Sequence, residues 1–427
     1  MTSGEAVRPA ALWRGRALAL FAIVLVALNL RTAVAALSPI FGEIGADIAL
    51  GSIGIGFIGL LPPLSFAVVG VFAPGLHRRF GLEPVVIGAM LAVLAGHLVR
   101  SASGSYLVLV LGSVLTFAGM GLANVLLPAL VKRYFPDRIG LLTSLYATVM
   151  AVGATVPPLV AVPVADAAGW RVSVGLWAVF AVLALVPLVG LQVRAGRDAR
   201  ATAAAAGADT AVAGVAVGVP DPVAEQPERA GLALVLRSGL AWSLMLVFAL
   251  TAINAYAMFA WLPEILVDVA GVSQAEAGAL LSLFAVMGLP ASLAVPILAG
   301  RLPTVWPLII TGSAFYLAGY AGLLLAPTAA TGLWVAFIGL GPLLFPLSLV
   351  LINLRTRTHA GTVALSSFVQ SAGYGLGALG PLLLGVLHDL TGGWTAALLL
   401  LIGTAVGVVI CGFVLARPRM LEDQWHN

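Results

Sequence analysis

Arg31 is the residue whose type and position say most about the chemistry of this chain, because it lies inside a long apolar run. It falls about 14 residues into that run, or about 21 Å along a helix, which is near the middle of a bilayer if the run crosses one. A guanidinium there costs about 2.5–3.5 kcal/mol, so it requires a partner or a cavity. Three arrangements satisfy it: an anionic substrate on its planar fork of donors, hydrogen bonds to neighbours such as Gln370, or extension of the side chain to the outer surface.

Gln370 and Tyr374 form a second candidate group, since residues four apart share one face of a helix. A shift of 224 residues places them on Tyr146 and Met150, which are also four apart. We expect the two stripes to approach one central cavity from opposite halves of the chain, with hydrogen-bond donors beside an apolar wall that suits a small planar solute. Packing between helices is the alternative, and for Tyr146 the two interpretations are equally supported.

Other polar residues in apolar stretches, Asn29 and Asn254 among them, are weaker candidates for contact with the substrate. Asn29 lies two residues from Arg31 and so faces a different side of the helix, where bracing of a neighbouring helix competes with ligand contact. A later stretch carries Thr251, Asn254 and Tyr256; Thr251 can bond its own backbone, whereas Asn254 requires an outside partner. His97 is the span residue that titrates near neutral pH, but we expect it to have no role in proton transfer.

The elements that must position these residues are membrane helices. Of the 427 residues, 61% are apolar and 9% charged, which excludes an ordinary soluble enzyme and a disordered chain. The single cysteine, Cys411, excludes an intrachain disulfide. Reading for uninterrupted apolar stretches predicts twelve spans, centred near residues 27, 63, 92, 118, 152, 181, 250, 287, 313, 341, 373 and 405.

The distribution of charge predicts the orientation of these spans. With a cytoplasmic N-terminus, all of the 21 Lys and Arg residues except Arg31, Arg100 and Arg171 fall in the tails or the inner loops. This follows the positive-inside rule and predicts that both termini are cytoplasmic. The 17 acidic residues map to loops, tails or span ends, so Arg31 has no embedded carboxylate as a partner.

A compositional change divides the chain into two halves. Residues 194–237 are rich in Ala, Gly, Asp, Pro and Val without helical period, and they lack the large apolar side chains of a folded core. We interpret this segment as a flexible cytoplasmic linker between an N-terminal six-helix bundle, residues 1–193, and a C-terminal six-helix bundle, residues 238–427.

The two halves resemble each other under the shift of 224 residues. The pairs that coincide are Arg133 with Arg357, Gly153 with Gly377, Pro157 with Pro381, Gly169-Trp170 with Gly393-Trp394, and Pro39 with Pro263. They lie in an inner basic loop, at mid-helix Gly and Pro, and at an outer Trp suited to the membrane interface. The pattern predicts a duplicated six-helix unit and therefore two pseudo-symmetric bundles.

In these features and in several short motifs, the chain resembles the major facilitator superfamily, and within it the family of cyanate and 2-nitroimidazole transporters. The residues that carry the resemblance are Asn29-Leu30-Arg31, Arg78-Arg79-Phe80-Gly81-Leu82, Trp261-Leu262-Pro263, Leu365-Ser366, Gln370, Gly373-Tyr374, Gly380-Pro381-Leu382-Leu383 and His388-Asp389. The resemblance implies an all-α membrane fold of twelve helices and alternating access of a central site to the two sides.

The loop after the second span departs from the superfamily pattern. Arg79 and Gly81 fit the Gly-x-Leu-Ala-Asp-Arg-x-Gly pattern, but Arg78 occupies the position of its Asp. We therefore assign Arg78, Arg79 and Gly81 to gating by resemblance, with cations that meet helix C-termini or lipid phosphate in place of a carboxylate latch.

A carrier is the function class that these features favour. Lys132 is the only lysine, so the chain lacks the Gly-Lys pair of a phosphate-binding loop, and the five scattered His residues suit neither a metal site nor a membrane enzyme. A channel filter is not evident either. We expect a secondary active or facilitative transporter in a bacterial-type cytoplasmic membrane that moves a small anion such as cyanate or a carboxylate; the alternative is export of an uncharged nitroimidazole-like drug.

The sequence sets further expectations about partners. We expect no cofactor, no metal and no nucleic acid, contacts with membrane lipid, and a monomer. Protons or a counter-transported anion are candidates for energy coupling, and exchange, facilitated diffusion or protonation of the substrate would require no embedded acid.

Overall fold

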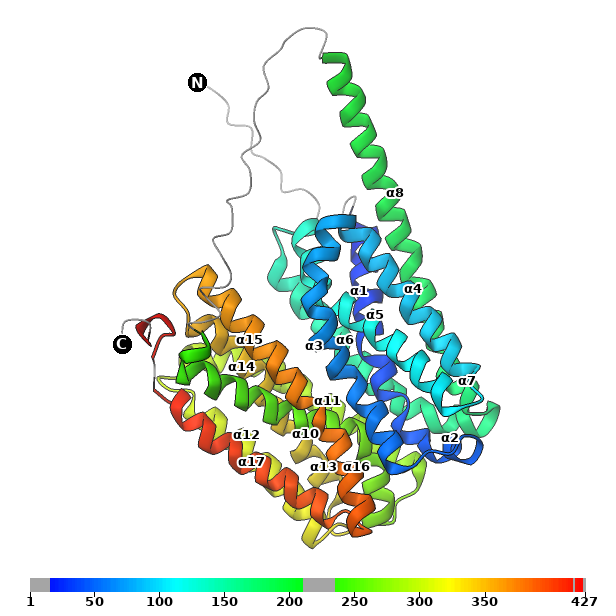
Figure 1. Ribbon diagram of the computed structural model, residues 1–427, viewed down its shortest axis with the longest axis vertical. Coiled ribbons are helices and arrows are strands. Elements are labelled where there is room, and N and C mark those ends of the chain that lie inside the picture. The colour runs from blue at the N-terminus through cyan, green and yellow to red at the C-terminus, as the bar shows by residue number, and fades with distance from the viewer. Residues whose placement is uncertain (1–15, 210–234, 418, 425–427) are drawn as a thin grey trace, which may run out of the picture.

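The chain folds into two helical halves, as shown in Figure 1 by a computed structural model that describes residues 16–209, 235–417 and 419–424. The helices of the first half are α1 (Ala17–Ala35), α2 (Phe41–Asp47), α3 (Ser52–Phe80), α4 (Leu82–Ser101), α5 (Tyr106–Tyr134), α6 (Ile139–Ala168), α7 (Trp170–Gly175) and α8 (Ala178–Asp209). A short 3-10 turn, η1 (Ser38–Ile40), joins α1 to α2.

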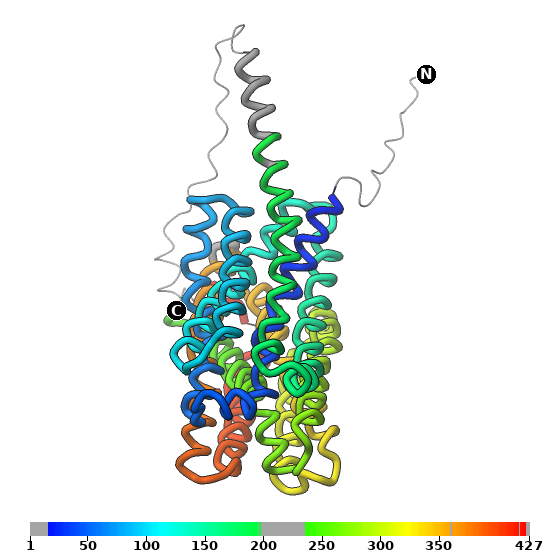
Figure 2. Tube along the Cα trace, turned by 90° about the vertical axis from the view of Figure 1, so that its right-hand side faces the viewer, coloured from blue at the N-terminus to red at the C-terminus, as the bar shows by residue number. Residues whose placement is uncertain are grey.

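The second half repeats this arrangement. Its helices are α10 (Gly239–Ala270), α11 (Gln274–Arg301), α12 (Trp306–Leu325), α13 (Thr331–Leu340), α14 (Leu344–Leu354), α15 (His359–Gly377), α16 (Leu379–Thr391) and α17 (Thr395–Leu415), with 3-10 turns η2 (Gly341–Leu343) and η3 (Glu422–Gln424). Figure 2 shows that the helices of both halves run along the same long axis.

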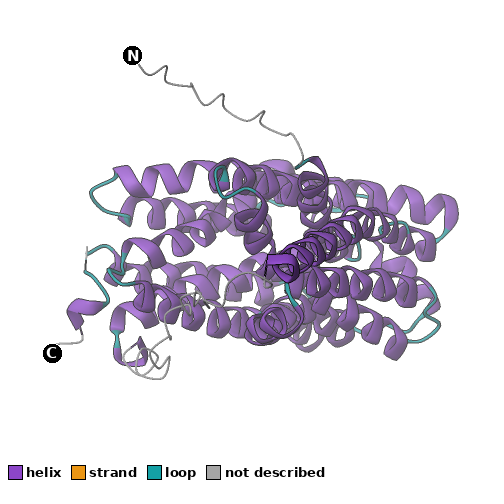
Figure 3. Ribbon diagram, turned by 90° about the horizontal axis from the view of Figure 1, so that it is seen from above, coloured by secondary structure: helices purple, strands orange, loops and turns teal. Residues whose placement is uncertain are grey.

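Twelve helical segments in the described residues are long and apolar enough to cross a membrane, and each contains one of the twelve predicted centres. The prediction of twelve spans is therefore confirmed, and the described residues form helices and loops only (Figure 3). Two breaks lie at or next to proline: η2 contains Pro342, and the break between α15 and α16 lies just before Pro381. Other prolines, such as Pro62 and Pro157, lie inside unbroken helices.

The internal repeat has a direct structural counterpart. A β-carbon at Gly153 of α6 would lie 2.5 Å from the Leu28 carbonyl oxygen of α1, and one at Gly377 would lie 2.6 Å from the Ala252 β-carbon of α10. Leu28 and Ala252 are themselves related by the shift of 224 residues. In each half, glycine therefore lets the first and fifth spans approach closely at the same level.

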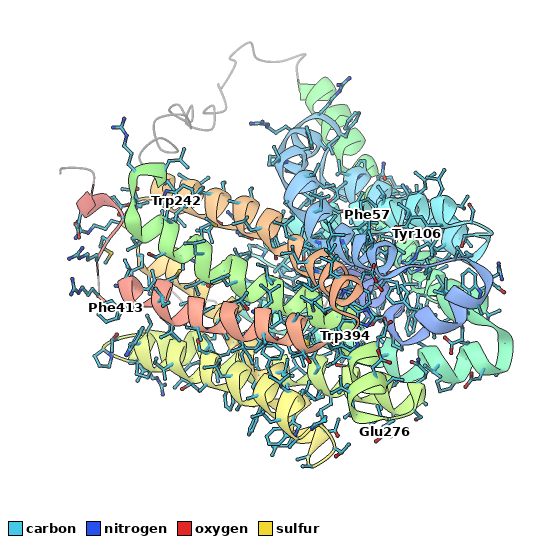
Figure 4. The ribbon with its side chains drawn as sticks, turned by 60° about the horizontal axis from the view of Figure 1, so that its bottom comes forward. Phe57, Tyr106, Trp242, Glu276, Trp394 and Phe413 are labelled. Carbon is cyan, nitrogen blue, oxygen red and sulfur yellow. The ribbon has the colours of Figure 1, made fainter. Side chains whose placement is uncertain are left out.

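A tryptophan-to-carboxylate hydrogen bond also recurs in the two halves. Trp170 Nε1 donates to Asp47 Oδ2 at 2.9 Å, and Trp394 Nε1 donates to Asp268 Oδ2 at 2.8 Å. In both cases the bond ties the start of a sixth span to the end of a first span. Trp394 lies where the second half approaches the first (Figure 4).

The two halves meet mainly through α3 with α16 and α6 with α11. We call the end of the molecule at which α1 begins and α17 ends the terminal end. The close contacts lie toward the opposite end: a β-carbon at Gly56 would be 2.8 Å from the Pro381 carbonyl oxygen, and one at Gly278 would be 2.6 Å from that of Pro158. In Figure 1, α3 and α15 diverge toward the terminal end.

The structure modifies the predicted linker. Helix α8 continues beyond the sixth span to Asp209, so residues 194–209 are helical rather than irregular. The run Ala201–Ala206, interrupted only by Thr202, explains this because alanine has the highest helix propensity. The rest of the predicted linker falls largely on residues 210–234, which lie outside the described residues.

Candidate functional site

Arg31 lies on α1 beside an aromatic ring of α3. Its guanidinium carbon is 5.7 Å from the centre of the Phe66 ring, which is a cation–π distance. Arg31 is partly buried, whereas Phe66 is only 5% exposed. The cation therefore has one face against an apolar ring of its own half and keeps part of its surface open.

The C-terminal half supplies the other side of this site. Tyr256 of α10 and Tyr374 of α15 both lie within electrostatic range of Arg31, and the Tyr256 hydroxyl is beside the guanidinium. The Tyr374 ring meets Phe66 edge to face, with centroids 5.9 Å apart, and lies 6.4 Å from the Tyr256 ring. We call Arg31, Phe66, Tyr256 and Tyr374 the central cluster, because it joins the two halves of the molecule.

More aromatic side chains extend the central cluster within the C-terminal half. Tyr374 contacts Phe248 of α10 edge to face at 5.0 Å and Phe345 of α14 at 6.0 Å, and these two phenylalanines are 4.6 Å apart. Such contacts hold the Tyr374 ring in a fixed orientation. Arg31 therefore faces a rigid aromatic wall.

The charge of Arg31 has no acidic partner among the described residues. The described ion pairs lie at the ends of the helices, as in Arg171 with Asp47, Arg133 with Glu83, and Arg357 with Asp423. A partly open cation that no described carboxylate pairs is suited to an anion that arrives from outside.

A small apolar pocket continues the site toward the opposite end. Its walls include Val34 of α1, Leu37 and Ser38 at the start of η1, Pro62 of α3, and Tyr256 and Phe259 of α10. The space open to the centre of a water molecule is about 20 Å³, which is room for about one water. The central cluster therefore has an apolar extension of limited depth.

The two residues of the predicted stripe on α15 lie in different environments. Tyr374 belongs to the central cluster, but Gln370 Nε2 donates to Ser366 Oγ, one turn earlier on the same helix, at 2.7 Å. Tyr146 is partly buried on α6. Joint contribution of Tyr146 and Gln370 to one cavity stays a prediction.

Asn254 lies in a different environment from the one that we expected. It is fully buried; its amide nitrogen donates to Leu250 O at 2.7 Å and to Thr404 Oγ1 at 2.8 Å, and its oxygen accepts from Tyr320 at 2.8 Å. The structure thus places Asn254 in the packing of α10, α12 and α17 rather than in the central cluster. The expectation that it needs an outside partner holds, but the partners are side chains of its own half.

Asn29 is also fully buried, and its amide nitrogen donates to Leu25 O on the same helix at 2.8 Å. This geometry favours the packing interpretation over ligand contact. His97 is 1% exposed, and Arg100, one of the three cations that do not fall in the tails or inner loops, is fully buried in the last turn of α4. Its side chain turns into the bundle, with Nη2 donating to Ala33 O at 3.4 Å and the guanidinium 5.5 Å from the Phe117 ring centre.

The predicted gating residues end α3 at the terminal end. Arg78 and Arg79 are exposed, and Gly81 adopts φ +87°, a conformation that lets the chain reverse directly into α4. The next residue but one, Glu83, is 4% exposed and accepts hydrogen bonds from Arg133 and Tyr134 of α5. Sequence reasoning missed this buried acid, because no local pattern in α4 or α5 indicates that Glu83 contacts Arg133 and Tyr134.

The central cluster is built from the first and second spans of one half and the first and fifth spans of the other. The sequence around it also matches a family of known carriers. The family model described as Major Facilitator Superfamily matches residues 19–378. The chain belongs to the Major Facilitator Superfamily. It is accordingly a multi-pass membrane carrier and not an enzyme, as the sequence predicted.

Relatives across the superfamily support this assignment. An uncharacterized transporter YycB of Bacillus subtilis is 32% identical, with 93% of each chain covered. The 2-nitroimidazole transporter of Escherichia coli is 29% identical over 96% of this chain and 98% of its own, and the cyanate transport protein CynX of Escherichia coli is 24% identical over 88% and 91%. The resemblance noted from the sequence is therefore confirmed.

Solved structures agree on the fold alone. A D-xylose–proton symporter superimposes with a TM-score of 0.70 at 15% identity, covering 94% of this chain and 98% of the symporter. A bacterial homologue of the lysosomal transporter Spinster, in an inward-facing and unoccupied conformation, gives a TM-score of 0.66 at 14% identity, covering 94% and 95%.

Proposed function

We propose that the chain is a secondary carrier that moves a small anion by alternating access, with Arg31 as its anion-binding group. The observation that carries this proposal is the central cluster: a partly open guanidinium placed between the two halves, which no described carboxylate pairs. A small carboxylate offers the two oxygens that a guanidinium fork binds in two places, and the linear cyanate ion can accept from the fork through one of its ends.

The conformation supports a rocking motion of two bundles. The halves touch at the opposite end through α3 with α16 and α6 with α11, and they diverge at the terminal end (Figure 1). We propose that the terminal end is cytoplasmic, as the positive-inside rule predicts, so that this conformation faces inward. Residues 1–193 and 238–427 then act as the two moving bundles.

A second candidate is export of an uncharged nitroimidazole-like compound. The relative named 2-nitroimidazole transporter and the aromatic side chains around Arg31 favour it. Coupling to protons or to a counter-anion belongs to either proposal, and we propose that a monomer carries out the transport.

Substitution of Arg31 in purified protein tests the anion proposal. Arg31→Lys keeps the charge but loses the fork, whereas Arg31→Gln loses the charge, so cyanate binding should weaken in both and more in Arg31→Gln. A charged hydrogen bond is worth about 1.5–3 kcal/mol, which corresponds to a loss of about tenfold to a hundredfold. The measurement is calorimetric titration with cyanate and with 2-nitroimidazole, followed by uptake into proteoliposomes with pH and voltage imposed separately.

The matched control is Arg301→Gln, which removes an exposed cation at the end of α11. It should bind as the unaltered protein does. Unchanged anion affinity in a folded Arg31→Gln protein would refute the anion proposal, and retained 2-nitroimidazole binding in that variant would favour the uncharged substrate.

A further inference from the structure

We propose that His388 makes the closure of the opposite end sensitive to protons: the contact holds while the imidazole is neutral and opens when the imidazole binds a proton. His388 belongs to the short motif His388-Asp389, which the anion site does not use. The inference rests on the proposed alternating access, and it does not depend on which solute is carried.

His388 lies on the boundary between the two halves. Its Nδ1 is 3.5 Å from the Oγ of Ser52, the first residue of α3 in the other half. One turn earlier on α16, a β-carbon at Gly385 would lie 2.5 Å from the Ser52 carbonyl oxygen and 2.9 Å from the Trp261 side chain. Helix α16 therefore lies directly against the start of α3, and the imidazole is part of that contact.

The N-terminal half favours the neutral imidazole. Helix α3 begins at Ser52, and its N-cap residue, Gly51, has no side chain that could bond the first backbone N–H groups. The positive end of the helix dipole is therefore not compensated there. A neutral imidazole can accept a hydrogen bond from the Ser52 hydroxyl, whereas an imidazolium has only donors and brings a positive charge to this end of the helix.

Burial acts in the same direction. The His388 side chain is 24% exposed, and its ring packs on that of Trp394 with the centroids 4.2 Å apart. Figure 4 shows Trp394 where the two halves approach each other. Burial disfavours the charged form of a titratable group, so separation of α3 from α16, which would expose more of the ring to water, favours the imidazolium.

The nearby carboxylates do not distinguish the two conformations. Asp389 Oδ1 is 4.0 Å from His388 Nδ1, Asp268 accepts the hydrogen bond of Trp394, and Glu264 of α10 lies within electrostatic range of both acids. All three belong to the same half as His388 and accompany it when the halves separate. They attract the proton in either conformation, so the difference between the conformations arises at α3.

The other helices packed against α16 bring no competing charge to this contact. Among the described residues, α3 has no charged side chain over residues 52–76, and α17 has none along its length. The Tyr106 hydroxyl donates to a backbone carbonyl of α3 at 3.0 Å, and Tyr374, the titratable group of α15 nearest to α16, belongs to the central cluster. Within this contact, His388 is therefore the group whose charge would act on α3.

Protonation and opening are therefore linked. The open conformation binds the proton more tightly than the closed one, so acid must shift the population toward the open conformation. A single charge at a helix end changes such an equilibrium by about twofold to fivefold. Histidine ordinarily changes its charge between pH 5 and 8, which is the range in which this shift is expected.

The first test measures the separation of the halves in purified protein without substrate. Spin labels replace Gly104 and Ala329, exposed loop residues of the two halves at the opposite end, in a Cys411→Ser background. We expect the ratio of open to closed molecules, read from the distance distribution, to rise about twofold to fivefold from pH 8 to pH 5. A distribution that stays constant over this range would overturn the proposal.

Variants assign the response to a side chain. His388→Gln keeps a neutral hydrogen-bonding group and should remove the response to pH. The matched control is His77→Gln, which removes a partly buried histidine at the other end of α3 and should retain the response. Glu264→Gln should also retain it. A response that persists in His388→Gln, or one that Glu264→Gln abolishes, would overturn the assignment to His388.

Asp389→Asn provides a variant that leaves the imidazole in place. It removes the nearest carboxylate, which is exposed, and the proton should then bind less tightly. We expect the midpoint of the response to move to lower pH, a change that a purely structural role of the contact would not produce. An unchanged midpoint would contradict the proposal.

The outcomes separate this inference from the proposed function. If the label distance changes when cyanate is added but does not respond to pH, the inference about His388 fails and the proposed carrier stands. If the distance responds neither to pH nor to cyanate, alternating access through this contact fails, and the inference fails with it.

Discussion

At the scale of single residues, a buried polar group and an open one have different consequences. Arg31 is partly open at the boundary between the halves, whereas Asn254 is closed within one half and has a partner for each of its polar atoms. A satisfied buried network contributes to stability and conformational uniqueness. We therefore expect substitution of the two residues to affect different measurements.

Asn254→Leu should destabilise the protein and leave substrate affinity unchanged. Tyr320 would lose the acceptor of its buried hydroxyl, at about 1–3 kcal/mol, whereas Thr404 would lose a donor but keep its hydrogen bond to the Leu401 carbonyl oxygen. Thermal unfolding in detergent measures the loss. Asn353→Leu is the control, because Asn353 is exposed and bonds only the Leu349 carbonyl of its own helix. Normal stability combined with lost binding in Asn254→Leu would instead place Asn254 in the substrate site.

The sequence singled out Arg31 and Tyr374 of the central cluster, but neither Tyr256 nor Phe66. Arg31 is conspicuous because an embedded cation is costly, and Tyr374 follows from its position on a polar stripe. Phe66 is one of 17 phenylalanines in an apolar chain, so nothing in its own type distinguishes it. Its role depends on tertiary contact with Arg31, which no local pattern encodes.

At the scale of elements, hydrogen bonds from a few polar residues determine where a helix begins or ends, which the apolar pattern of the sequence does not specify. The carboxylate of Glu422, in η3, accepts hydrogen bonds from the backbone nitrogens of Arg357 and Thr358 at 3.0 and 3.1 Å. These residues lead into α15, so the negative charge also faces the positive end of the helix dipole. The C-terminal segment thereby holds the start of the helix that carries Tyr374.

This contact should weaken in acid. Burial raises the pKa of Glu422, but hydrogen bonds from its own backbone, Thr358 and Arg357 together outweigh burial and lower the pKa below its usual value of 4.5. A carboxyl whose pKa is lower in the folded state stabilises that state fully above pH 4.5 and loses this contribution as pH falls through the lowered pKa. We expect the Arg357 and Thr358 amides to lose protection from hydrogen exchange over that range, after correction for intrinsic rates.

Glu422→Gln should reduce this protection at neutral pH and abolish its dependence on acid. Asp423→Asn is the matched control, since Asp423 pairs with Arg357 only through exposed side chains. Protection that is the same in Glu422→Gln and the unaltered protein would show that the carboxylate does not anchor α15.

Element boundaries also show where composition misleads. The Ala-rich start of the predicted linker has no amphipathic period, yet it continues α8 because helix propensity alone suffices next to an existing helix. The spans themselves were predictable because a length of apolar chain has few alternatives in a membrane. Their breaks were not predictable, because Pro342 and Pro381 lie at or next to a break whereas Pro62 and Pro157 lie inside continuous helices.

At the scale of the whole molecule, the terminal end gathers the basic loops. We expect tags at both termini and in residues 210–234 to be cytoplasmic, because moving these cations across a membrane during insertion is unfavourable. Protease added to intact cells should leave the linker uncut and should cut it only in inverted vesicles. Cleavage of the linker in intact cells would reverse the orientation and, with it, the direction in which this conformation opens.

The contact between the two halves also bears on the proposed alternating access. Closure at the opposite end depends on the approach of α3 and α16, where a β-carbon at Gly56 would lie 2.8 Å from the Pro381 carbonyl oxygen and 3.0 Å from the Leu382 α-carbon. Ser52 Oγ and His388 Nδ1 lie 3.5 Å apart in the same contact. Under the proposed alternating access, these groups separate when the site opens toward the opposite end.

Gly56→Ala should therefore weaken this closure and shift the population toward the conformation open at the opposite end. Cysteines at positions 52 and 388, in a Cys411→Ser background, report closure by their cross-linking yield. The yield should fall in Gly56→Ala and stay constant in Gly88→Ala, because a β-carbon at Gly88 meets nothing within 4 Å. The cross-link itself should stop transport, since a site held closed at one end cannot alternate. An unchanged yield in Gly56→Ala, or full transport by the cross-linked protein, would contradict alternating access through this contact.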